Sequence, residues 1–481
     1  MTAPLARIVN DPAFSNVVEK RYFQYFRRKT VASTNSLMDS RFWDRIVLQI
    51  CHVEPAVKHA VLALSSLHQI SEARHDKDLA LRHQRFADHQ YQRALSAAQG
   101  LLSSSSAADI DRVLIACLVF TCYENVRGNY LASQMHTGSG RAILAEHRDR
   151  LSRLSRRNDL NEIQALFARL DIAAMAFSVS NARYPYDSES FYATNPNLVP
   201  DAFDSVEGAR APLMDHVRWF WVHEQGVFEA AFRTGFPYES LETERQRVCD
   251  HLLRWATRFE KVVEKDANAS PILIRTLRIW HQIVSIQGAA HWYGPETRFD
   301  HFIPEYERIV TWSEEIIEML SQTQDRGNFS FDLGATICLF EAVQRCRDPH
   351  IRRRALEALR RGPQQEGTWG RLGAAATAEQ WMLYEEAGLG TVEKASDVPD
   401  WRRIVNLDAS VNAELGVAEV LFHVTPSQGH EDELTMGFLG ATTLEGEEAS
   451  MDAAIKPFSM GIGHTISFRA SFDDRLSSTS M

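Results

Sequence analysis

Cysteine is scarce in this chain of 481 residues. Most of its cysteines lie within apolar stretches of helical character, as in the segment IACLVFTCYE. Such placement excludes a disulfide-stapled scaffold and predicts free, buried thiols in a reducing compartment. The six are Cys51, Cys117, Cys122, Cys249, Cys338 and Cys346.

Long hydrophobic runs are also missing. The most apolar stretch, Leu114–Tyr123, is well short of the about 20 residues that a membrane-spanning helix needs. The segment 1–20 contains no apolar run of the signal-peptide type. We therefore expect a soluble, intracellular protein that does not contact a membrane.

Positive charge is in deficit, because 52 Lys and Arg residues stand against 63 Asp and Glu residues, for a formal net charge of -11. An acidic body is repelled by phosphate groups, so the surface as a whole is a poor binder of nucleic acid.

The sequence motifs of common enzymes are absent. No Gly-x-x-x-x-Gly-Lys-Ser/Thr phosphate loop occurs, and no His-Glu-x-x-His zinc motif. The segment nearest to a serine nucleophile elbow, Thr137–Gly140, lacks the Gly-x-Ser-x-Gly spacing. We expect no enzyme, and therefore no catalytic, cofactor-binding or metal-binding residues.

Two pairs of polar residues have a functional and a structural interpretation. Asp109 and Asp111 could form part of a metal-binding aspartate set of a helical terpene cyclase, but a cap at a helix start explains them better. His83 and His89 are six positions apart, so they do not share a helix face as metal ligands would; we expect solvated surface histidines.

Charged pairs and runs favour structural roles as well. Glu124 and Arg127 are three positions apart, which predicts an ion pair at a helix end. The arginines of 352–354 and 360–361 form a basic helix face. A solvated face is favoured over a nuclear-import or docking surface.

Helical periodicity dominates most of the chain, and 44% hydrophobic residues suffice for a large core, so the predicted fold class is all-α. Ser40 and Asp109 stand where they would cap helices, and Pro55 stands where a first helical turn tolerates it. The nearly all-apolar helix from Ile110 belongs at the centre of the bundle. Expected helices cover 42–50, 57–67, 79–102, 110–118, 129–147, 162–178, 212–232, 243–264, 271–294, 304–321, 332–346 and 350–361.

Strand character is scarce before about residue 415. Val417–Val424 is rich in β-branched and aromatic residues, and His464–Phe472 roughly alternates, so each predicts a short strand or an arm of a hairpin. The segment Glu431–Asp452 contains seven acidic residues and no Lys or Arg, which predicts a partly disordered, mobile acidic tail. The chain then divides into a lead-in (1–20), a helical unit (21–410) and a C-terminal segment (411–481).

Several segments carry a resemblance to a known family. The first reads YFRRKTVASTNSLMDSRFWDRIVLQICHVEPAVKHAVLALSSLH from Tyr25, with Phe42-Trp43, then Glu54-Pro55, then His59-Ala60 and Ala63-Leu64. This order resembles the opening of the regulatory (middle homology) region of fungal zinc-cluster transcription factors.

Later segments resemble the same family in the same order, from about residue 20 to 405. LIACLVFTCYENVRGNYLASQMHTGSGRAIL is similar to its apolar helix with Tyr-Glu, Arg-Gly and His-x-x-x-Gly. LFARLDIAAMAF adds Arg-Leu-Asp, and CRDPHIRRRALEALRRGPQQEGTW adds the Cys-Arg-Asp-Pro helix and the Glu-Gly-x-Trp turn. The resemblance implies a large multi-helix regulatory domain in nucleus and cytoplasm that controls transcription, often of a secondary-metabolite gene cluster.

One departure from the family concerns DNA. The family's DNA-binding module has two Cys-x-x-Cys groups, whose six thiolates enclose two zinc ions. Here four residues separate Cys117 from Cys122, seven separate Cys338 from Cys346, and no Cys-x-x-Cys occurs. We expect contact with DNA only indirectly, through other transcription factors or co-regulators; a dimer and a small-molecule effector stay open.

Two alternatives remain. A truncated gene model would place the zinc cluster in an upstream exon. An all-helical enzyme would need paired carboxylates or histidines on facing helices, and the sequence offers no convincing set. The acidic segment mixes carboxylates with Leu434, Phe438, Leu439 and Leu444, which fits an activation segment or a plain solvating tail.

Overall fold

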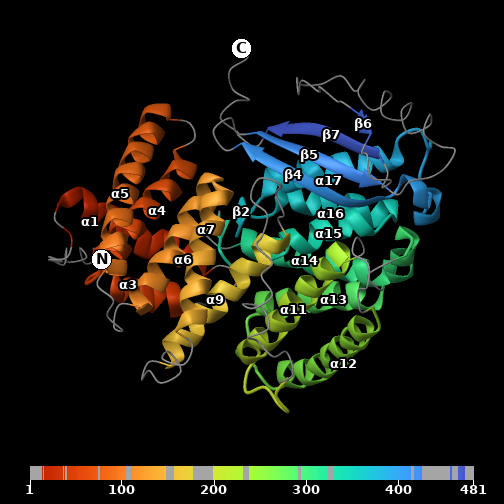
Figure 1. Cartoon of the computed structure of the whole chain (residues 1–481), viewed down its shortest axis with the longest axis horizontal. Coiled ribbons are helices and arrows are strands. Elements are labelled where there is room, and N and C mark those ends of the chain that lie inside the picture. The colour runs from red at the N-terminus through yellow and green to blue at the C-terminus, as the bar shows by residue number, and fades with distance from the viewer. Residues whose placement is uncertain are drawn as a thin grey trace, which may run out of the picture.

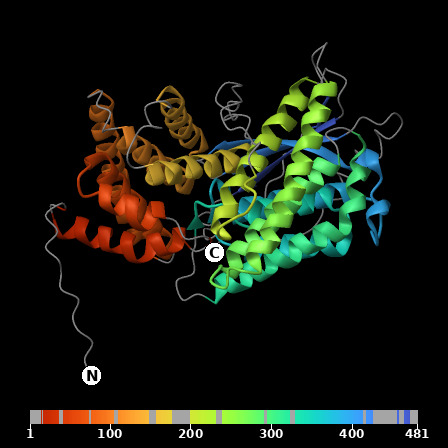
Figure 2. The same cartoon turned by 90° about the horizontal axis from the view of Figure 1, so that it is seen from below.

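Two clusters of packed helices form the core, and a small sheet lies against the second (Figures 1 and 2). The first cluster, red to orange, occupies one end of the molecule and the second, green to cyan, the other. The computed structural model describes residues 14, 16–35, 37, 41–73, 76–103, 110–147, 157–176, 199–230, 238–290, 294–322, 329–412, 417–424, 455–457 and 464–471.

The first cluster is built around α6, in which every residue from Val113 to Asn125 is buried. This confirms the predicted central position of the helix. It is surrounded by the other N-terminal elements and the first part of α9. The elements of the first cluster, α6 included, are α1 (Val17–Tyr25), the π-helical turn η1 (Phe26–Thr30), α2 (Val31–Thr34), the π-helical turn η2 (Phe42–Ile46), α3 (Val47–Ile50), α4 (Pro55–Glu72), α5 (Lys77–Ser103), α6 (Ile110–Arg127), α7 (Tyr130–Glu146) and α9 (Arg157–Ala176).

Helix α4 begins for local reasons that the sequence shows. Pro55 occupies the first turn, where a backbone N–H has no partner within the helix. The side chain of Glu54 accepts a hydrogen bond from the backbone N–H of Ala56 at 3.2 Å. Helix α5 then packs along α4, and the hydroxyl of Ser66 donates to the backbone carbonyl of His83 at 2.8 Å.

The second cluster is formed by the later helices, several of which start at a side-chain cap. Ser270 caps α13 and Asp348 caps α16, each followed by a proline at the first position. Its elements are η4 (Glu207–Ala209), α11 (Arg210–Ala230), α12 (Tyr238–Val263), α13 (Pro271–Ala289), η5 (Glu296–Phe302), α14 (Ile303–Ser321), α15 (Thr336–Arg345), α16 (Pro349–Arg361), α17 (Arg371–Glu386), η6 (Ala395–Asp397) and η7 (Asp400–Arg402).

A four-stranded antiparallel sheet covers α17, in the order β4-β5-β7-β6 (Figure 1). The rings of Trp381 in α17 and Phe422 in β5 meet edge to face, with centroids 5.3 Å apart. The strands are β4 (Ile404–Asn412), β5 (Val417–Val424), β6 (Ile455–Pro457) and β7 (His464–Ser471). A second, minor sheet joins β1 (Phe329–Ser330), β2 (Gln365–Glu366) and β3 (Trp369–Gly370).

The predicted all-α class with short C-terminal strands is confirmed. Each expected helix is present, although α6 continues beyond 118 to Arg127, and the two expected strands are β5 and β7. Helices α1 and α17 and strand β4 were not expected; α17 is rich in alanine and has little amphipathic contrast. Ser40, Asp109 and the acidic segment Glu431–Asp452 lie outside the described residues.

Several histidines of the first cluster are buried, which corrects one prediction. His83, expected on the surface, is 3% exposed, and its Nδ1 lies 2.8 Å from the hydroxyl of Tyr22. The correction arises because α1 covers this side of α5, a contact that periodicity within α5 cannot show. His89, by contrast, is exposed as expected.

Two glycines of α7 give a matched test of helix packing. A Cβ at Gly140 would overlap the ring of Phe167 in α9, whereas a Cβ at Gly138 would meet nothing within 4 Å. We expect Gly140→Ala to lower the free energy of unfolding by about 1–3 kcal/mol through overpacking. Gly138→Ala should raise it by about 0.5–1 kcal/mol through helix propensity. Urea denaturation of both variants measures this, and an equal response would refute close α7–α9 packing.

Acid should destabilise the first cluster. Burial lowers the pKa of His68 and of His136 from 6.5 to about 4. Since each is neutral when folded and takes up a proton when unfolded, stability present above pH 6.5 is lost as the pH falls toward 4. The loss should approach about 3 kcal/mol per histidine.

Urea denaturation at about pH 7 and pH 4.5 tests this dependence on His68. The variant His68→Gln should lose less stability on acidification than the unmodified chain, whereas an identical loss would show that His68 does not contribute.

Candidate functional site

The chain passes between the two clusters in α9 and again just before α15, and each of these two crossings carries a buried aspartate. In α9, Leu170 belongs to the first cluster and Ile172 to the second, and Asp171 stands between them. Before α15, Phe331 packs into the first cluster and Leu333 into the second. Asp332 stands between these two. We call the charged groups around Asp171 and Asp332 the junction.

Asp332 pairs with two arginines that come from different helices. Arg169 of α9 contacts Oδ1 of Asp332, and Nη1 of Arg210 in α11 lies 3.8 Å from Oδ2. The side chains of Arg169 and Asp332 are each 2% exposed. Burial lowers the pKa of Arg169, and the nearby Asp332 carboxylate opposes that shift. Arg210 also pairs with Glu207 at 2.6 Å.

Asp171 is held by arginines from the helices on either side. Nε of Arg141 in α7 lies 3.4 Å from its Oδ1, and Nη2 of Arg218 in α11 lies 2.9 Å from its Oδ2. Asp171 is 1% exposed. An isolated carboxylate at such a depth would cost several kcal/mol, so the two arginines are what makes its burial tolerable.

The turn between β2 and β3 forms hydrogen bonds to α9 next to the junction. The hydroxyl of Thr368 and the indole N–H of Trp369 both donate to the backbone carbonyl of Ala173, at 3.0 and 3.3 Å. Gly367 adopts a φ of 56°, which glycine tolerates best. The carboxylate of Glu366 accepts from the backbone N–H of Thr336 at 2.8 Å and so caps α15.

A second set of buried charges joins α15, α16 and α17 to the sheet. The carboxylate of Glu385 accepts from Arg347 at 2.9 Å, from Arg352 at 2.6 Å and from the backbone N–H of Ile404 at 2.8 Å. Burial alone would raise the pKa of Glu385, but Arg347 and Arg352 hold it at about 2. Arg347 also reaches Glu296 at 3.1 Å.

This network corrects the prediction of a basic surface on α16. Arg352 is fully buried, because it faces α17 and its Glu385 rather than solvent. The other arginines of this helix are at least partly exposed, and each is paired with a glutamate. The pairs are Arg353–Glu386, Arg354–Glu314, Arg360–Glu379 and Arg361–Glu357.

The predicted ion pair between Glu124 and Arg127 is replaced by another. Arg127 pairs with Asp88 of α5 at 3.4 Å, and Glu124 is 3% exposed. Burial raises the pKa of Glu124, opposed by its hydrogen bond with Tyr91. The competing partners come from α5, which lies beside α6. Asp111 lies in the first turn of α6, in agreement with the proposed structural role.

The cysteines are free thiols, as predicted, and all but the partly buried Cys249 are buried. Within the described residues, no group of three or more His, Cys, Asp or Glu side chains is placed to hold a metal ion. In that same part of the chain, no helix is both long enough and apolar enough to cross a bilayer.

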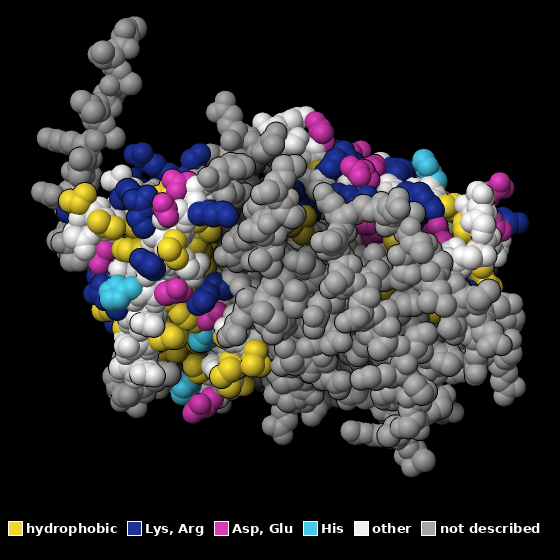
Figure 3. All heavy atoms as spheres, turned by 90° about the horizontal axis from the view of Figure 1, so that it is seen from above, with side chains coloured by type: hydrophobic (Ala, Val, Ile, Leu, Met, Phe, Trp, Pro, Cys, Tyr) yellow, Lys and Arg dark blue, Asp and Glu magenta, His cyan; other side chains and the backbone are white. Residues whose placement is uncertain are grey.

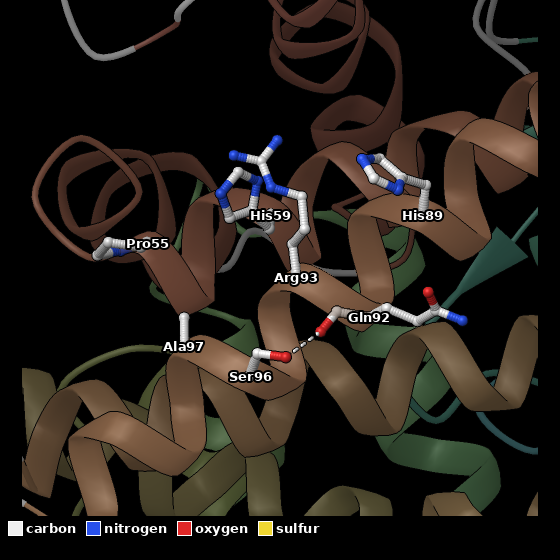
Figure 4. A pocket seen from close by; sticks show the side chains of 7 residues that line it. All are labelled: Pro55, His59, His89, Gln92, Arg93, Ser96 and Ala97. Atoms are coloured by element: carbon white, nitrogen blue, oxygen red, sulfur yellow. Dashed lines mark hydrogen bonds between the residues drawn. The ribbon is translucent and has the colours of Figure 1, made fainter.

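A cavity of about 380 Å³ opens between α4 and α5, on the first cluster. The side chains of His59 and Arg93 lie next to each other at its wall (Figure 4). Nδ1 of His59 is hydrogen-bonded to Oε1 of Gln90 at 2.7 Å. Burial lowers the pKa of His59, so its ring is neutral. The lining combines these groups with other polar and small residues and contains no carboxylate. It consists of Pro55, His59, His89, Gln92, Arg93, Ser96 and Ala97.

Sequence reasoning found some of these residues and missed others. Arg169 and Asp171 were quoted within the Arg-Leu-Asp element, and Arg347 within Cys-Arg-Asp-Pro. The partners Asp332 and Glu385 were missed. The available signal was a charged residue inside an otherwise apolar stretch, such as Asp332 between Phe331 and Leu333.

Comparison with known proteins identifies the first part of the chain. Residues 21–218 match the model of the family described as fungal specific transcription factor domain. We refer to this segment, which is similar to that family, as the transcription factor domain. The match confirms the resemblance found in the sequence, and it extends from α1 through the first cluster to Arg218, the partner of Asp171.

Two curated fungal relatives extend the likeness beyond the transcription factor domain. The Aspercryptin biosynthesis cluster-specific transcription regulator of Emericella nidulans is 23% identical over 322 residues, which cover 63% of this chain and 50% of the relative. A transcription regulator of Purpureocillium lilacinum is 28% identical over 269 residues, covering 53% of this chain and 59% of the relative. The chain thus spans about half the length of these relatives, and no solved structure matches it.

Removal of one junction charge should destabilise the transcription factor domain. The variant Asp332→Asn leaves Arg169 buried without its carboxylate and removes one of the two carboxylates beside Arg210, so we expect a loss of about 3 kcal/mol or more in the free energy of unfolding. Asp201→Asn is the control, because Asp201 pairs with Arg258 at an exposed position. Urea denaturation should show a large shift for the first variant and none for the second; similar shifts would contradict the importance of the junction.

Proposed function

We propose that this chain is a transcriptional regulator or co-regulator of a fungal metabolic gene cluster. The observation that carries the proposal is the match of residues 21–218 to the fungal specific transcription factor domain. The two relatives support it, because both are described as transcription regulators and one as specific for a biosynthesis cluster. A protein of this class acts in the nucleus.

We further propose that the chain reaches promoters through partner proteins. This sequence contains no Cys-x-x-Cys pair, and its thiols are mostly buried inside the helical clusters. Burial raises the pKa of Cys117 and Cys346 to about 12, which keeps both as neutral thiols and makes them poor metal ligands at neutral pH. The helices described therefore supply packing surfaces rather than a zinc-dependent reader of DNA.

A second candidate is favoured by the lengths of the relatives. Because the chain spans about half of each, it could correspond to the regulatory part of a longer factor that carries its own zinc cluster. Translation of the genomic sequence around the coding region, and a search there for six cysteines in Cys-x-x-Cys groups, separates the two candidates.

Recruitment of the full chain to a reporter promoter tests the regulatory proposal. Fused to an unrelated DNA-binding domain, the chain should change reporter output several-fold relative to that domain alone, whereas the unfused chain should have no effect. The variant Asp332→Asn should reduce the change in proportion to the protein's loss of stability, and the exposed Asp201→Asn should not. Unchanged output from a well-expressed fusion would contradict the proposal.

A further inference from the structure

Several arginines at the surface of the second cluster are paired with carboxylates of neighbouring helices. Arg278 pairs with Glu260 at 2.6 Å, Arg360 pairs with Glu379 at 2.7 Å, and Arg353 pairs with Glu386 at 2.5 Å. Such pairs reduce the positive charge that these particular arginines offer to a partner.

The N-terminal helices differ in this respect. From Val17 to Lys29 the chain carries five Lys or Arg residues and one carboxylate, Glu19, which is buried. Five arginines of α1, η1 and α5 are exposed and form no ion pair with any described residue. We call them the cationic face: Arg21, Arg27, Arg28, Arg82 and Arg85.

Contacts between α1 and α5 place Arg21 beside the part of α5 that carries Arg82 and Arg85. The ring of Tyr22 stacks on Phe86 with centroids 4.1 Å apart, and its hydroxyl lies 2.8 Å from Nδ1 of His83. Arg21 lies over the Tyr22 ring at 5.1 Å. Arg82 is one helical turn from Phe86, so Arg21 and Arg82 lie on either side of the contact between Tyr22 and Phe86.

Apolar side chains are exposed on the same helices. Val17 and Val18 of α1 are 82% and 50% exposed, and Leu81 of α5 is 48% exposed. Figure 3 shows hydrophobic side chains interspersed with Lys or Arg and with Asp or Glu side chains over this end of the molecule. The cavity between α4 and α5 adjoins this surface, because Arg93 in its wall pairs with Glu19 of α1 at 3.4 Å.

We propose that the cationic face is a docking surface for a segment of a partner protein in which acidic and apolar residues are mixed. Carboxylates would pair with the unpaired guanidinium groups, and apolar side chains would cover Val18 and Leu81. The inference deepens the proposed function by naming the partner's chemistry.

Charge favours this occupant over duplex DNA. The chain has a net charge of -11, which opposes a long polyanion approaching from any distance within the screening length. A short peptide contacts only the local surface and avoids most of that repulsion. The exposed valines and leucine also have no role in phosphate binding, whereas they match the apolar positions of a peptide.

Fluorescence anisotropy of the full chain with a labelled synthetic peptide of alternating Glu-Asp and Leu-Phe pairs tests the surface directly. We expect a dissociation constant of about 10 μM at low salt, weakening with added salt. The double variant Arg82→Gln/Arg85→Gln should weaken binding about tenfold. The matched control Arg45→Gln/Arg361→Gln removes the same charge from exposed positions elsewhere and should change binding less than about twofold.

A further variant and a second peptide show whether apolar contacts contribute to binding. Leu81→Ser should weaken binding of the mixed peptide but not of an all-glutamate peptide of equal length, because only the mixed peptide has apolar side chains to cover Leu81. Equal loss in the two double variants, absence of peptide binding, or tighter binding of a duplex than of the peptide would each overturn the proposal. Because the assay contains no promoter, failure here leaves the reporter result for the proposed function intact.

Discussion

Two buried carboxylates, Asp171 and Asp332, stand where the chain passes between its hydrophobic clusters, and the mutual arrangement of the clusters depends on them. A buried charge is costly unless it is paired, so each carboxylate requires its arginines in place. Those arginines come from α7, α9 and α11. Hydrophobic packing alone is non-directional and would not fix how one cluster sits on the other.

The junction also explains why the transcription factor domain and the later helices belong together. The family match ends at Arg218, and Asp332 lies beyond it, yet Asp332 neutralises Arg169 inside the matched segment. The Thr368 and Trp369 side chains bond to Ala173 in the same segment. The matched domain therefore depends on later residues to pair with some of its buried polar groups. A partner docked on the first cluster would bind a surface that is connected to the second cluster through these contacts.

Much of this architecture is readable from the sequence, and the limits have a physical origin. Local signals such as Pro55 at a first turn or the β-branched run Val417–Val424 are set by neighbouring residues, so their elements were predicted correctly. Pairing across the fold is not local. Arg352 looks solvated on its own helix and His83 looks exposed on α5, because the helices that cover them come from distant parts of the chain. The functional class came from ordered motif resemblance, whereas the carboxylate partners came only from the structure.

Native-state hydrogen exchange across the whole chain tests the account most directly. If the junction makes the two clusters one cooperative unit, the slowest amides of α6 and of α15 will exchange with the same free energy of opening, and denaturant will lower both in parallel. Clearly different opening free energies for α6 and α15, with separate responses to denaturant, would show that the clusters unfold independently and would contradict the central role of Asp171 and Asp332.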